Sequence, residues 1–429
     1  MPLSNPMVRT APTYIVAAYN SSDAGRADFV CPEVDSLDFI TTEVIPELPT
    51  SGGSIAFLEG TYYCSTFRKP LKIDSLSEVS LLGQGGSTVF ALSNGVQSNL
   101  IHVVNSDHIF IDGLYIDGTT TSDEDGSLPN QTQNGVFLDV CKKSVISNCV
   151  STENKGYGIN LYIGSTNNKV VNCVCSSNGH HGILAALDAT ENIITSNRCV
   201  DNTENGIRVE ADADRCIIAD NTVTNNSLFG IYVHRADSVV VSGNSLYGNT
   251  QHGIILEESD YSSIIGNTCQ QNQYNGICLN NSDYNTITGN SCRAAPSYNG
   301  IYVYQSSGNV VSSNSCLENT RYGILVTDVS NRNLIANNSC IDNDFNNTNT
   351  YDGIGIDNDS DYNHVTGNLC YVTVAGTNQR YGINITNANC DGTFVIGNDL
   401  YQAGRTGDYN DAGTGTIYHS NRTTVGWVA

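Results

Sequence analysis

A glycine followed by alternating apolar residues recurs along this chain at a nearly constant interval. The glycines that open the unit are Gly135, Gly158, Gly182, Gly206, Gly230, Gly253, Gly276, Gly300, Gly323, Gly353 and Gly382. The first eight intervals are 23 or 24 residues, and the last two are 30 and 29 residues. A fixed period of this length is typical of a solenoid, in which each repeat forms one coil that stacks on the next.

The residues after each glycine alternate between apolar and polar side chains. In the run Gly206-Ile207-Arg208-Val209-Glu210, a period of two directs Ile207 and Val209 inward and Arg208 and Glu210 outward. A coil of about 23 residues has room for three short strands and three bends. We therefore predict an all-β fold, namely a single-stranded right-handed parallel β-helix of about 12 coils.

Asparagine and cysteine recur with the same period. The repeated asparagines are Asn221, Asn244, Asn267, Asn290, Asn314, Asn338, Asn368 and Asn398, and the repeated cysteines are Cys269, Cys292, Cys316, Cys340 and Cys370. Asparagine tolerates the left-handed conformation and can bond the coils above and below, so its stack is expected to form turns. The 15 cysteines are odd in number, and we interpret the periodic ones as an internal stack of free thiols rather than as disulfides or a zinc site.

The first 100 residues differ from the repeat. Leu37, Ile40, Val44 and Leu48 have helical spacing, so a short helix over residues 36–48, capped by Asp35 or Ser36, is expected to close the open end of the solenoid. We divide the chain into residues 1–100 as the cap and first coils, 101–400 as the β-helix, and 401–429 as a C-terminal tail or cap. Polar excursions are expected at 119–133, 342–352 and 372–380.

The charge of the chain restricts its partners. With 43 acidic and 19 basic side chains, the formal net charge is −24, which repels nucleic acid and anionic membranes, so we predict neither as a partner. No apolar run approaches the roughly 20 residues that span a bilayer. No signal peptide is visible at the N-terminus, and the chemistry favours an extracellular or virion-associated protein.

Two segments of the first 100 residues resemble a known family. The run from Gly52 to Tyr62 and the Leu81-Leu82-Gly83-Gln84-Gly85 turn, together with the helix, are similar to the start of pectate-lyase-like β-helix proteins, which include phage tailspikes and depolymerases. The resemblance extends over residues 13–400. It implies a polysaccharide as partner and a monomer or homotrimer, and the superfamily contains lyases, hydrolases, epimerases and structural members.

Side chains one repeat apart become neighbours in a β-helix, so a site is expected as columns on one wall. The outward positions between residues 208 and 304 gather carboxylates, a histidine, an arginine and tyrosines, and more aromatic residues precede the glycines. This pattern is typical of a sugar-binding groove. The expected substrate-binding residues are Tyr232, Tyr302, Tyr304, His181 and His252.

Two carboxylates on this wall lie two coils apart. The backbones of Glu210 and Glu257 are expected to be about 9.6 Å apart, twice the inter-strand spacing. That separation suits an inverting glycoside hydrolase, in which one carboxyl is the acid and the other activates water. We predict Glu210 and Glu257 as catalytic residues, with His234 between them and Arg208 shaping the groove. The alternative is that this column is ordinary polar surface.

Other activities stay open on the same wall. Residues 229–234 align with the Tyr-Gly-Phe-Asp-Pro-His motif of mannuronan epimerases, sharing His234 and carrying Phe229 and Tyr232 where that family has Tyr and Asp. Arg208 beside nearby carboxylates is similar to the arginine base of pectate lyases. A non-catalytic fibre that binds glycans through Tyr232, Tyr302 and Tyr304 is a further alternative.

One segment has the pattern of a cation site. Asp357, Asp359 and Asp361 alternate as the carboxylates of a calcium loop do, which makes them the candidate metal ligands. The alternative is a solvated strand edge. We predict that no cofactor is required, with calcium as the ion that these carboxylates would bind.

Overall fold

The computed structural model describes residues 13–93, 95–118, 133–374 and 378–428. It contains two compact units, residues 1–184 and 185–429. Each unit is a right-handed parallel β-solenoid, which confirms the predicted fold class. The coils number about 15 rather than 12, because strands such as β3 (Gly53–Phe57) and β42 (Ile417–His419) lie outside the glycine repeat. All but one residue of the predicted excursion at 119–133 lies outside the described residues.

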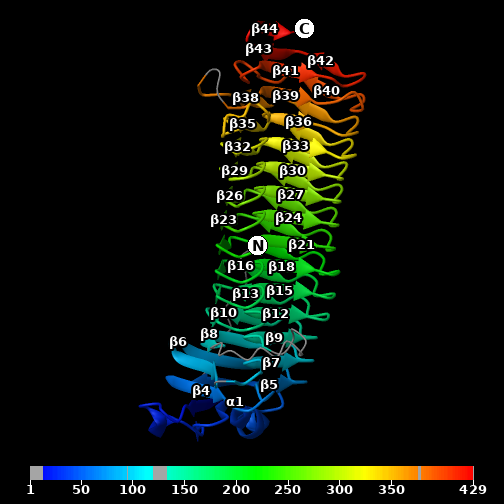
Figure 1. Cartoon of the computed structure of the whole chain (residues 1–429). Coiled ribbons are helices and arrows are strands. Elements are labelled where there is room, and N and C mark those ends of the chain that lie inside the picture. Colours follow the sequence, from blue (N-terminus) through cyan, green and yellow to red (C-terminus); the bar gives the residue numbers. More distant parts are fainter. Residues whose placement is uncertain (1–12, 94, 119–132, 375–377, 429) are drawn as a thin grey trace. The chain divides into compact units, whose positions relative to one another are not determined.

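The first unit begins with short strands and a helical segment (Figure 1). Its strands are β1 (Tyr14–Ala17), β2 (Phe29–Val30), β3, β4 (Gly60–Cys64), β5 (Leu71–Asp74), β6 (Val79–Leu92), β7 (Ile101–Val104), β8 (Phe110–Asp117), β9 (Val136–Asp139), β10 (Val145–Ser147), β11 (Val150–Thr152), β12 (Ile159–Tyr162), β13 (Lys169–Val171) and β14 (Val174–Ser176), and β15 (Ile183–Ala186) contains the boundary residues. The strand pairs described in this unit, such as β7 with β9 and β9 with β12, are parallel.

The helix begins at Ser36 as predicted but changes its winding. After η1 (Ala24–Arg26), helix α1 (Ser36–Phe39) continues as a wider turn, η2 (Ile40–Val44), and a tighter one, η3 (Ile45–Glu47). Pro46 explains the change, since it has no N–H to donate to the carbonyl four residues earlier. Asp35 does not cap the helix with its side chain, because its carboxylate accepts the Ser65 N–H at 2.9 Å and the Thr66 hydroxyl at 2.6 Å.

In the second unit, one parallel sheet carries the strands that follow the repeat glycines, and we call this sheet the glycine wall. Its strands are β18 (Ile207–Glu210), β21 (Ile231–His234), β24 (Ile254–Glu257), β27 (Ile277–Asn280), β30 (Ile301–Tyr304), β33 (Ile324–Thr327), β36 (Ile354–Ile356), β39 (Tyr381–Ile385) and β41 (Gly407–Asp411). They stack in chain order (Figure 1). Ile207 pairs with Ile231, and Ile231 with Ile254, so the inward side chains stack directly on one another.

Two further strands complete most coils of the second unit. The first set is β16 (Ile193–Thr195), β19 (Ile217–Ala219), β22 (Val240–Ser242), β25 (Ser263–Ile265), β28 (Thr286–Thr288), β31 (Val310–Ser312), β34 (Leu334–Ala336), β37 (His364–Thr366), β40 (Phe394–Ile396) and β42. The second set is β17 (Arg198–Val200), β20 (Thr222–Thr224), β23 (Ser245–Tyr247), β26 (Thr268–Gln270), β29 (Ser291–Arg293), β32 (Ser315–Leu317), β35 (Ser339–Ile341) and β38 (Leu369–Tyr371). An antiparallel pair, β43 (Asn421–Thr423) with β44 (Gly426–Val428), follows β42.

The asparagine stack is a hydrogen-bonded ladder inside the bends between these two sets. The Asn267 side-chain amide donates to the Asn290 carbonyl oxygen at 3.0 Å, and Asn290 donates to Asn314 at 3.0 Å. The predicted bonding between coils is therefore confirmed. The predicted left-handed conformation is wrong for these asparagines, because it belongs to the residue before each of them, such as Gly266 (φ 64°) and Gly289 (φ 67°).

The cysteine stack is confirmed as well. Cys269, Cys292, Cys316, Cys340 and Cys370 pair in register from one coil to the next. They are buried, and all 15 cysteines are free thiols. In the described part of the chain, none of the helical segments has the length and apolar character needed to span a bilayer.

Candidate functional site

The glycine wall brings the predicted catalytic residues together. Its register pairs Glu210 with His234 and His234 with Glu257, so the three side chains form one column. Arg208 begins a second column, in which it pairs with Tyr232. The side chains of Arg208 and Glu210 keep 24% and 23% of their surface exposed. The equal coil lengths therefore place these four residues on one outer wall, as the repeat predicted.

Glu257 accepts two hydrogen bonds from its neighbours. The Tyr232 hydroxyl donates to one oxygen of the carboxylate, and the Asn280 amide donates to the other at 2.8 Å. Burial and the bond to Glu257 raise the pKa of Tyr232, so this side chain stays a neutral phenol and a proton donor.

Glu210 is paired with Arg208. The Arg208 guanidinium bonds a carboxylate oxygen of Glu210, and its central carbon lies 4.8 Å from the centroid of the Tyr232 ring. Arg208 is therefore already engaged by Glu210 and Tyr232.

Two buried polar atoms at this site have no hydrogen-bond partner among the described residues, namely Nδ1 of His234 and Nε of Arg208. The His234 ring stacks on Tyr232, with centroids 5.5 Å apart and planes at 16°. Buried polar atoms without partners are rare in folded proteins and often accompany catalysis, bound water or a ligand.

A run of aromatic rings lies in the bends that lead into the glycine wall. Phe229 stacks on His252 with centroids 5.5 Å apart, His252 meets Tyr274 edge-on at 5.6 Å, and Tyr274 lies 4.8 Å from Tyr298. The spacing is one ring per coil. Flat rings at regular intervals suit the apolar faces of consecutive sugars.

His252 has a defined protonation state within this run. Its Nδ1 accepts the backbone N–H of Asn275 at 3.1 Å, so in the neutral ring the proton is on Nε2. Burial lowers the pKa of His252 to about 4. The side chain is therefore neutral near pH 7 and keeps one N–H to donate.

We expect the nuclear magnetic resonance signal of the His252 ring to titrate with a midpoint near pH 4, because burial disfavours its charged form. Since this pKa is lower than that of an unfolded histidine, protonation of His252 should weaken the fold as pH falls from about 6.5 towards 4. The His252→Gln variant identifies the signal and should lack this part of the pH dependence. A midpoint near 6.5 would contradict the neutral, buried ring.

A hollow of about 310 Å³ lies beside the aromatic run and is lined mainly by His252, Tyr274, Tyr298, Tyr302, Arg321 and Tyr322. The Arg321 guanidinium carbon lies 4.0 Å from the Tyr298 ring centroid. Arg321 and Tyr322 were not among the residues predicted from the sequence. A signal was available, since Arg321-Tyr322-Gly323 occupies the same repeat positions as Tyr298-Asn299-Gly300.

The predicted substrate-binding residues fall into two groups. Tyr302 and His252 line the hollow, and Tyr304 stacks on Tyr302 with centroids 5.8 Å apart. His181 belongs to the first unit, is 2% exposed and packs on Tyr157. It has no free surface for a sugar, so its prediction as a binding residue is wrong.

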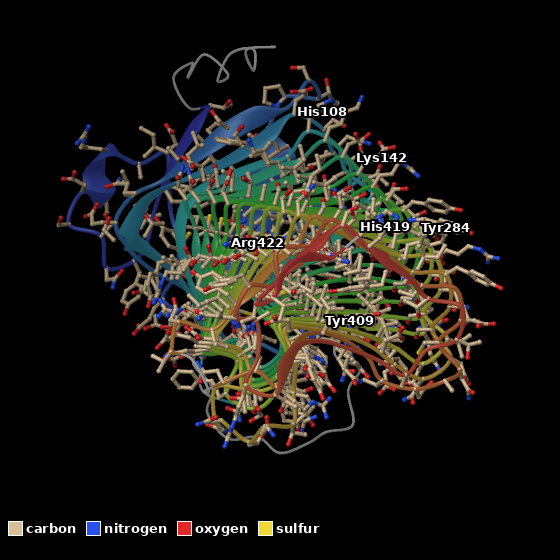
Figure 2. The ribbon with its side chains drawn as sticks, turned by 90° about the horizontal axis from the view of Figure 1, so that it is seen from above. His108, Lys142, Tyr284, Tyr409, His419 and Arg422 are labelled. Carbon is tan, nitrogen blue, oxygen red and sulfur yellow. The ribbon has the colours of Figure 1, made fainter. Side chains whose placement is uncertain are left out.

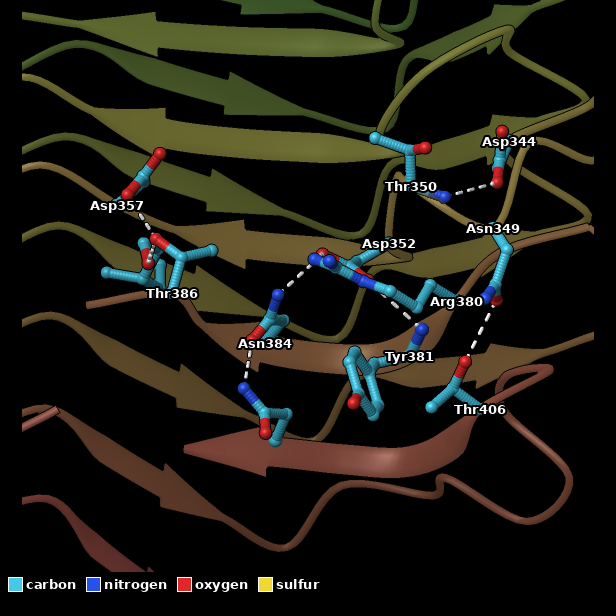
Figure 3. Close-up of polar contacts among 12 residues, drawn as sticks. Asp344, Asn349, Thr350, Asp352, Asp357, Arg380, Tyr381, Asn384, Thr386 and Thr406 are labelled. Carbon is cyan, nitrogen blue, oxygen red and sulfur yellow. Dashed lines mark hydrogen bonds and ion pairs between the residues drawn. The ribbon is translucent and has the colours of Figure 1, made fainter. Parts of the chain in front are cut away.

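The predicted calcium ligands do not converge. Strand β36 ends at Ile356, and Asn358 and Asp359 have left-handed φ angles of 45° and 56°, so this segment is a turn and not a strand with alternating side chains. Asp357 accepts a bond from Thr386 (Figure 3) and another from Asn387. Asp361 accepts the Asp391 N–H at 2.7 Å. Over the described residues, no three His, Cys, Asp or Glu side chains group as metal ligands. The predicted metal site at Asp357, Asp359 and Asp361 is therefore wrong.

Comparisons with solved structures agree with the fold. The chain resembles the pre-mature gene product 12 of bacteriophage phi29, with 14% identity, a TM-score of 0.56, and coverage of 88% of this chain and 55% of that one. It also resembles the periplasmic alginate epimerase AlgG (16% identity, TM-score 0.54, 82% and 79% coverage). A third likeness is to the A-module of the mannuronan C-5 epimerase AlgE4 of Azotobacter vinelandii (16%, 0.51, 94% and 96%). At these identities the likeness concerns the fold alone, and it agrees with the predicted parallel β-helix.

Sequence comparison gives a family. No curated protein matches this chain. The family model described as periplasmic copper-binding protein (NosD) matches residues 85–235, 185–298 and 212–353, which together cover more than half of the chain. Overlapping matches of this kind are expected when a family is built from a repeat that this chain contains many times. The coils with their periodic glycines and asparagines are thus those of a known group, and the chain belongs to the NosD family of parallel β-helix proteins.

Proposed function

We propose that the glycine wall from β18 to β33 binds an extended polysaccharide and that Glu257 lies at the centre of its reaction site. The observation that carries this proposal is the combination of one aromatic ring per coil, from Phe229 to Tyr298, with a carboxylate column on the adjacent strands. Rings bind sugar faces, and carboxylates bind hydroxyls and transfer protons. The solved structures of alginate epimerases support a polysaccharide as the partner class.

The reaction that we propose first is glycoside hydrolysis. Glu210, paired with Arg208, is the base that activates water. Glu257 is the acid: substrate displaces its donors Tyr232 and Asn280, and solvent water supplies the proton that it carries before the reaction. Glu257 passes that proton to the leaving oxygen while Glu210 takes one from the attacking water. The two-coil separation of about 9.6 Å leaves room for sugar and water, as inversion requires.

A second candidate is proton abstraction next to a uronate carboxylate, as in a lyase or an epimerase. The observation that favours it is the stacked pair of Tyr232 and His234, in which the His234 Nδ1 has no partner within the described residues. One ring would remove a proton and the other would return it or donate to the leaving group. A non-catalytic glycan-binding protein is the third candidate, and it needs only the aromatic run.

The family description names copper, a metal that needs a specific set of ligands. Copper binds clustered imidazole and thiolate ligands, whereas no such cluster occurs in the described part of the chain. The thiols are all buried. These residues do not fit a copper site, and no step proposed here uses the metal.

The same comparisons bear on location. The family description and the AlgG structure both name a periplasmic protein, and another similar structure is that of a phage protein. We propose that the protein acts outside the cytoplasm, as an exported or virion-associated protein. The choice between a monomer and a homotrimer stays a prediction.

We expect Glu210→Gln and Glu257→Gln each to lower kcat on the cleaved polysaccharide by about 100-fold or more with little change in Tm, because each removes an acid or base group. The matched control is Glu258→Gln, which changes the exposed neighbour of Glu257 and should leave kcat unchanged.

The assay incubates the full chain with acidic and neutral polysaccharides. It scores reducing ends for hydrolysis, ultraviolet absorbance of unsaturated uronates for a lyase, and hydrogen exchange with solvent for an epimerase. Full activity in both glutamine variants would remove the two glutamates from the mechanism. Binding without any of the three products would leave the non-catalytic candidate.

A further inference from the structure

The hollow beside the aromatic run contains a cation without an acidic partner. Arg321 packs on Tyr298, and its guanidinium carbon lies 5.6 Å from the ring of Tyr351. Among the described residues it forms no ion pair, whereas Arg293, Arg380 and Arg422 all do. In a chain of net charge −24, an arginine that is held by rings and free of carboxylates is available to an anion from outside.

The hollow also presents a donor of fixed direction. Because the backbone N–H of Asn275 occupies Nδ1 of His252, the neutral ring presents Nε2–H as its donor. Tyr274, Tyr302 and Tyr322 supply ring surface around it. A volume of about 310 Å³ is at the small end of ligand sites and suits one sugar residue rather than an oligomer.

Arg208 cannot take the same role without losing its partner. Its guanidinium is paired with Glu210, so an anionic group on the substrate would compete with a carboxylate already in place. Arg321 has no such competitor among the described residues. Of these two arginines, Arg321 is therefore the one that is available to bind a negatively charged group of the substrate.

We propose that this hollow is a subsite for a sugar residue that carries an anionic group, either a carboxylate or a sulfate ester, with Arg321 as the ligand of the anion and His252 as a hydrogen-bond donor. The substrate is then an acidic polysaccharide. This inference rests on the proposed function, because the hollow adjoins the aromatic run that would bind the neighbouring sugars.

The test is calorimetric titration of the full chain with matched hexasaccharides. The panel holds oligogalacturonate and oligomannuronate, their neutral methyl esters, and a sulfated and an unsulfated hexamer of one neutral sugar. We expect at least one anionic hexamer to bind about tenfold or more tightly than its neutral partner, as a charge-assisted bond provides. Whether the uronate or the sulfated arm shows the preference identifies the anionic group.

Variants of Arg321 test whether this residue causes the preference for anionic hexamers. Arg321→Gln should abolish the preference for the anion while neutral hexamers bind as before, and Arg321→Lys should restore part of it. The matched control is Arg332→Gln, which removes an equal charge from an arginine beside Tyr362, outside the hollow. An unchanged preference in Arg321→Gln, or an equal loss in Arg332→Gln, would overturn the inference.

Failure of this inference and failure of the proposed function look different. If neutral and anionic hexamers bind equally well, the anionic subsite is wrong and the polysaccharide proposal stands. If no hexamer binds, both are wrong. Tyr274→Ala should weaken every hexamer that binds, whereas Tyr284→Ala, which changes an exposed ring at the outer margin of the coils (Figure 2), should weaken none.

Discussion

Replacing Arg380 with methionine is expected to lower the free energy of unfolding by about 3–5 kcal/mol, the range for leaving one partner of a buried ion pair alone. The Arg380 guanidinium bonds both oxygens of Asp352, at 3.0 and 2.8 Å (Figure 3). Asp352 is 0% exposed and also accepts the Asn384 amide at 2.8 Å. Without the guanidinium, a charged carboxylate would remain inside the coil.

The effect of this substitution should depend on pH. Burial raises the pKa of Asp352, and Arg380 opposes that shift. In the Arg380→Met variant the folded-state pKa should rise further above the unfolded value, so stability is lost as pH rises from about 4 towards the folded-state pKa. Urea denaturation at about pH 4 and pH 7 measures this, with the larger deficit expected at pH 7.

The matched control is the same substitution at Arg422 (Figure 2), whose ion pair with Asp399 is exposed. Surface ion pairs contribute about 0–1 kcal/mol, so Arg422→Met should have little effect. A loss at Arg380 no larger than the loss at Arg422 would show that the buried pair is not what holds these coils.

Replacing Asn290 with alanine is expected to cost roughly 2–6 kcal/mol, because two buried donors of the preceding coil lose their acceptor and each such loss costs about 1–3 kcal/mol. The backbone N–H of Asn267 donates to the Asn290 side chain at 2.8 Å, and the Asn267 amide donates at 3.0 Å. No water reaches this bend, since both asparagines are 1% exposed.

The comparison for the ladder is Gln273→Ala. Gln273 also bonds the next coil, through Ser297 at 2.7 Å, but on the exposed surface, so its loss should stay within about 0.5 kcal/mol. Urea denaturation of both variants measures the difference. Equal stabilities would mean that the asparagine ladder is replaceable and that the apolar stack alone holds the coils together.

The repeat predicted the site because strand pairing translates sequence spacing into position. Coils of 23 or 24 residues put Glu210, His234 and Glu257 in register without any knowledge of tertiary contacts. The prediction failed where the spacing changes. Asp357 lies in the 29-residue interval from Gly353 to Gly382, and the chain around it forms a turn instead of a strand.

The repeat also did not predict the backbone conformation in the bends or the winding of the helix. The repeat marks a bend at each asparagine, but the left-handed residue is the one before it, such as Gly266 before Asn267. The helix was predicted from its apolar spacing, and Pro46 altered its winding by removing a donor.

The order of amino acids was sufficient to derive the solenoid, its inward and outward faces and the columns of the glycine wall, because all of these follow from a constant period and parallel pairing. Only the tertiary structure shows that Tyr232 and Asn280 donate hydrogen bonds to Glu257 and that Glu210 forms an ion pair with Arg208. It also shows that Arg321 forms no ion pair with a carboxylate among the described residues. The reason is physical: the period sets where each Cα lies, whereas the partner that a side chain reaches depends on its torsion angles and on its packing against neighbouring coils.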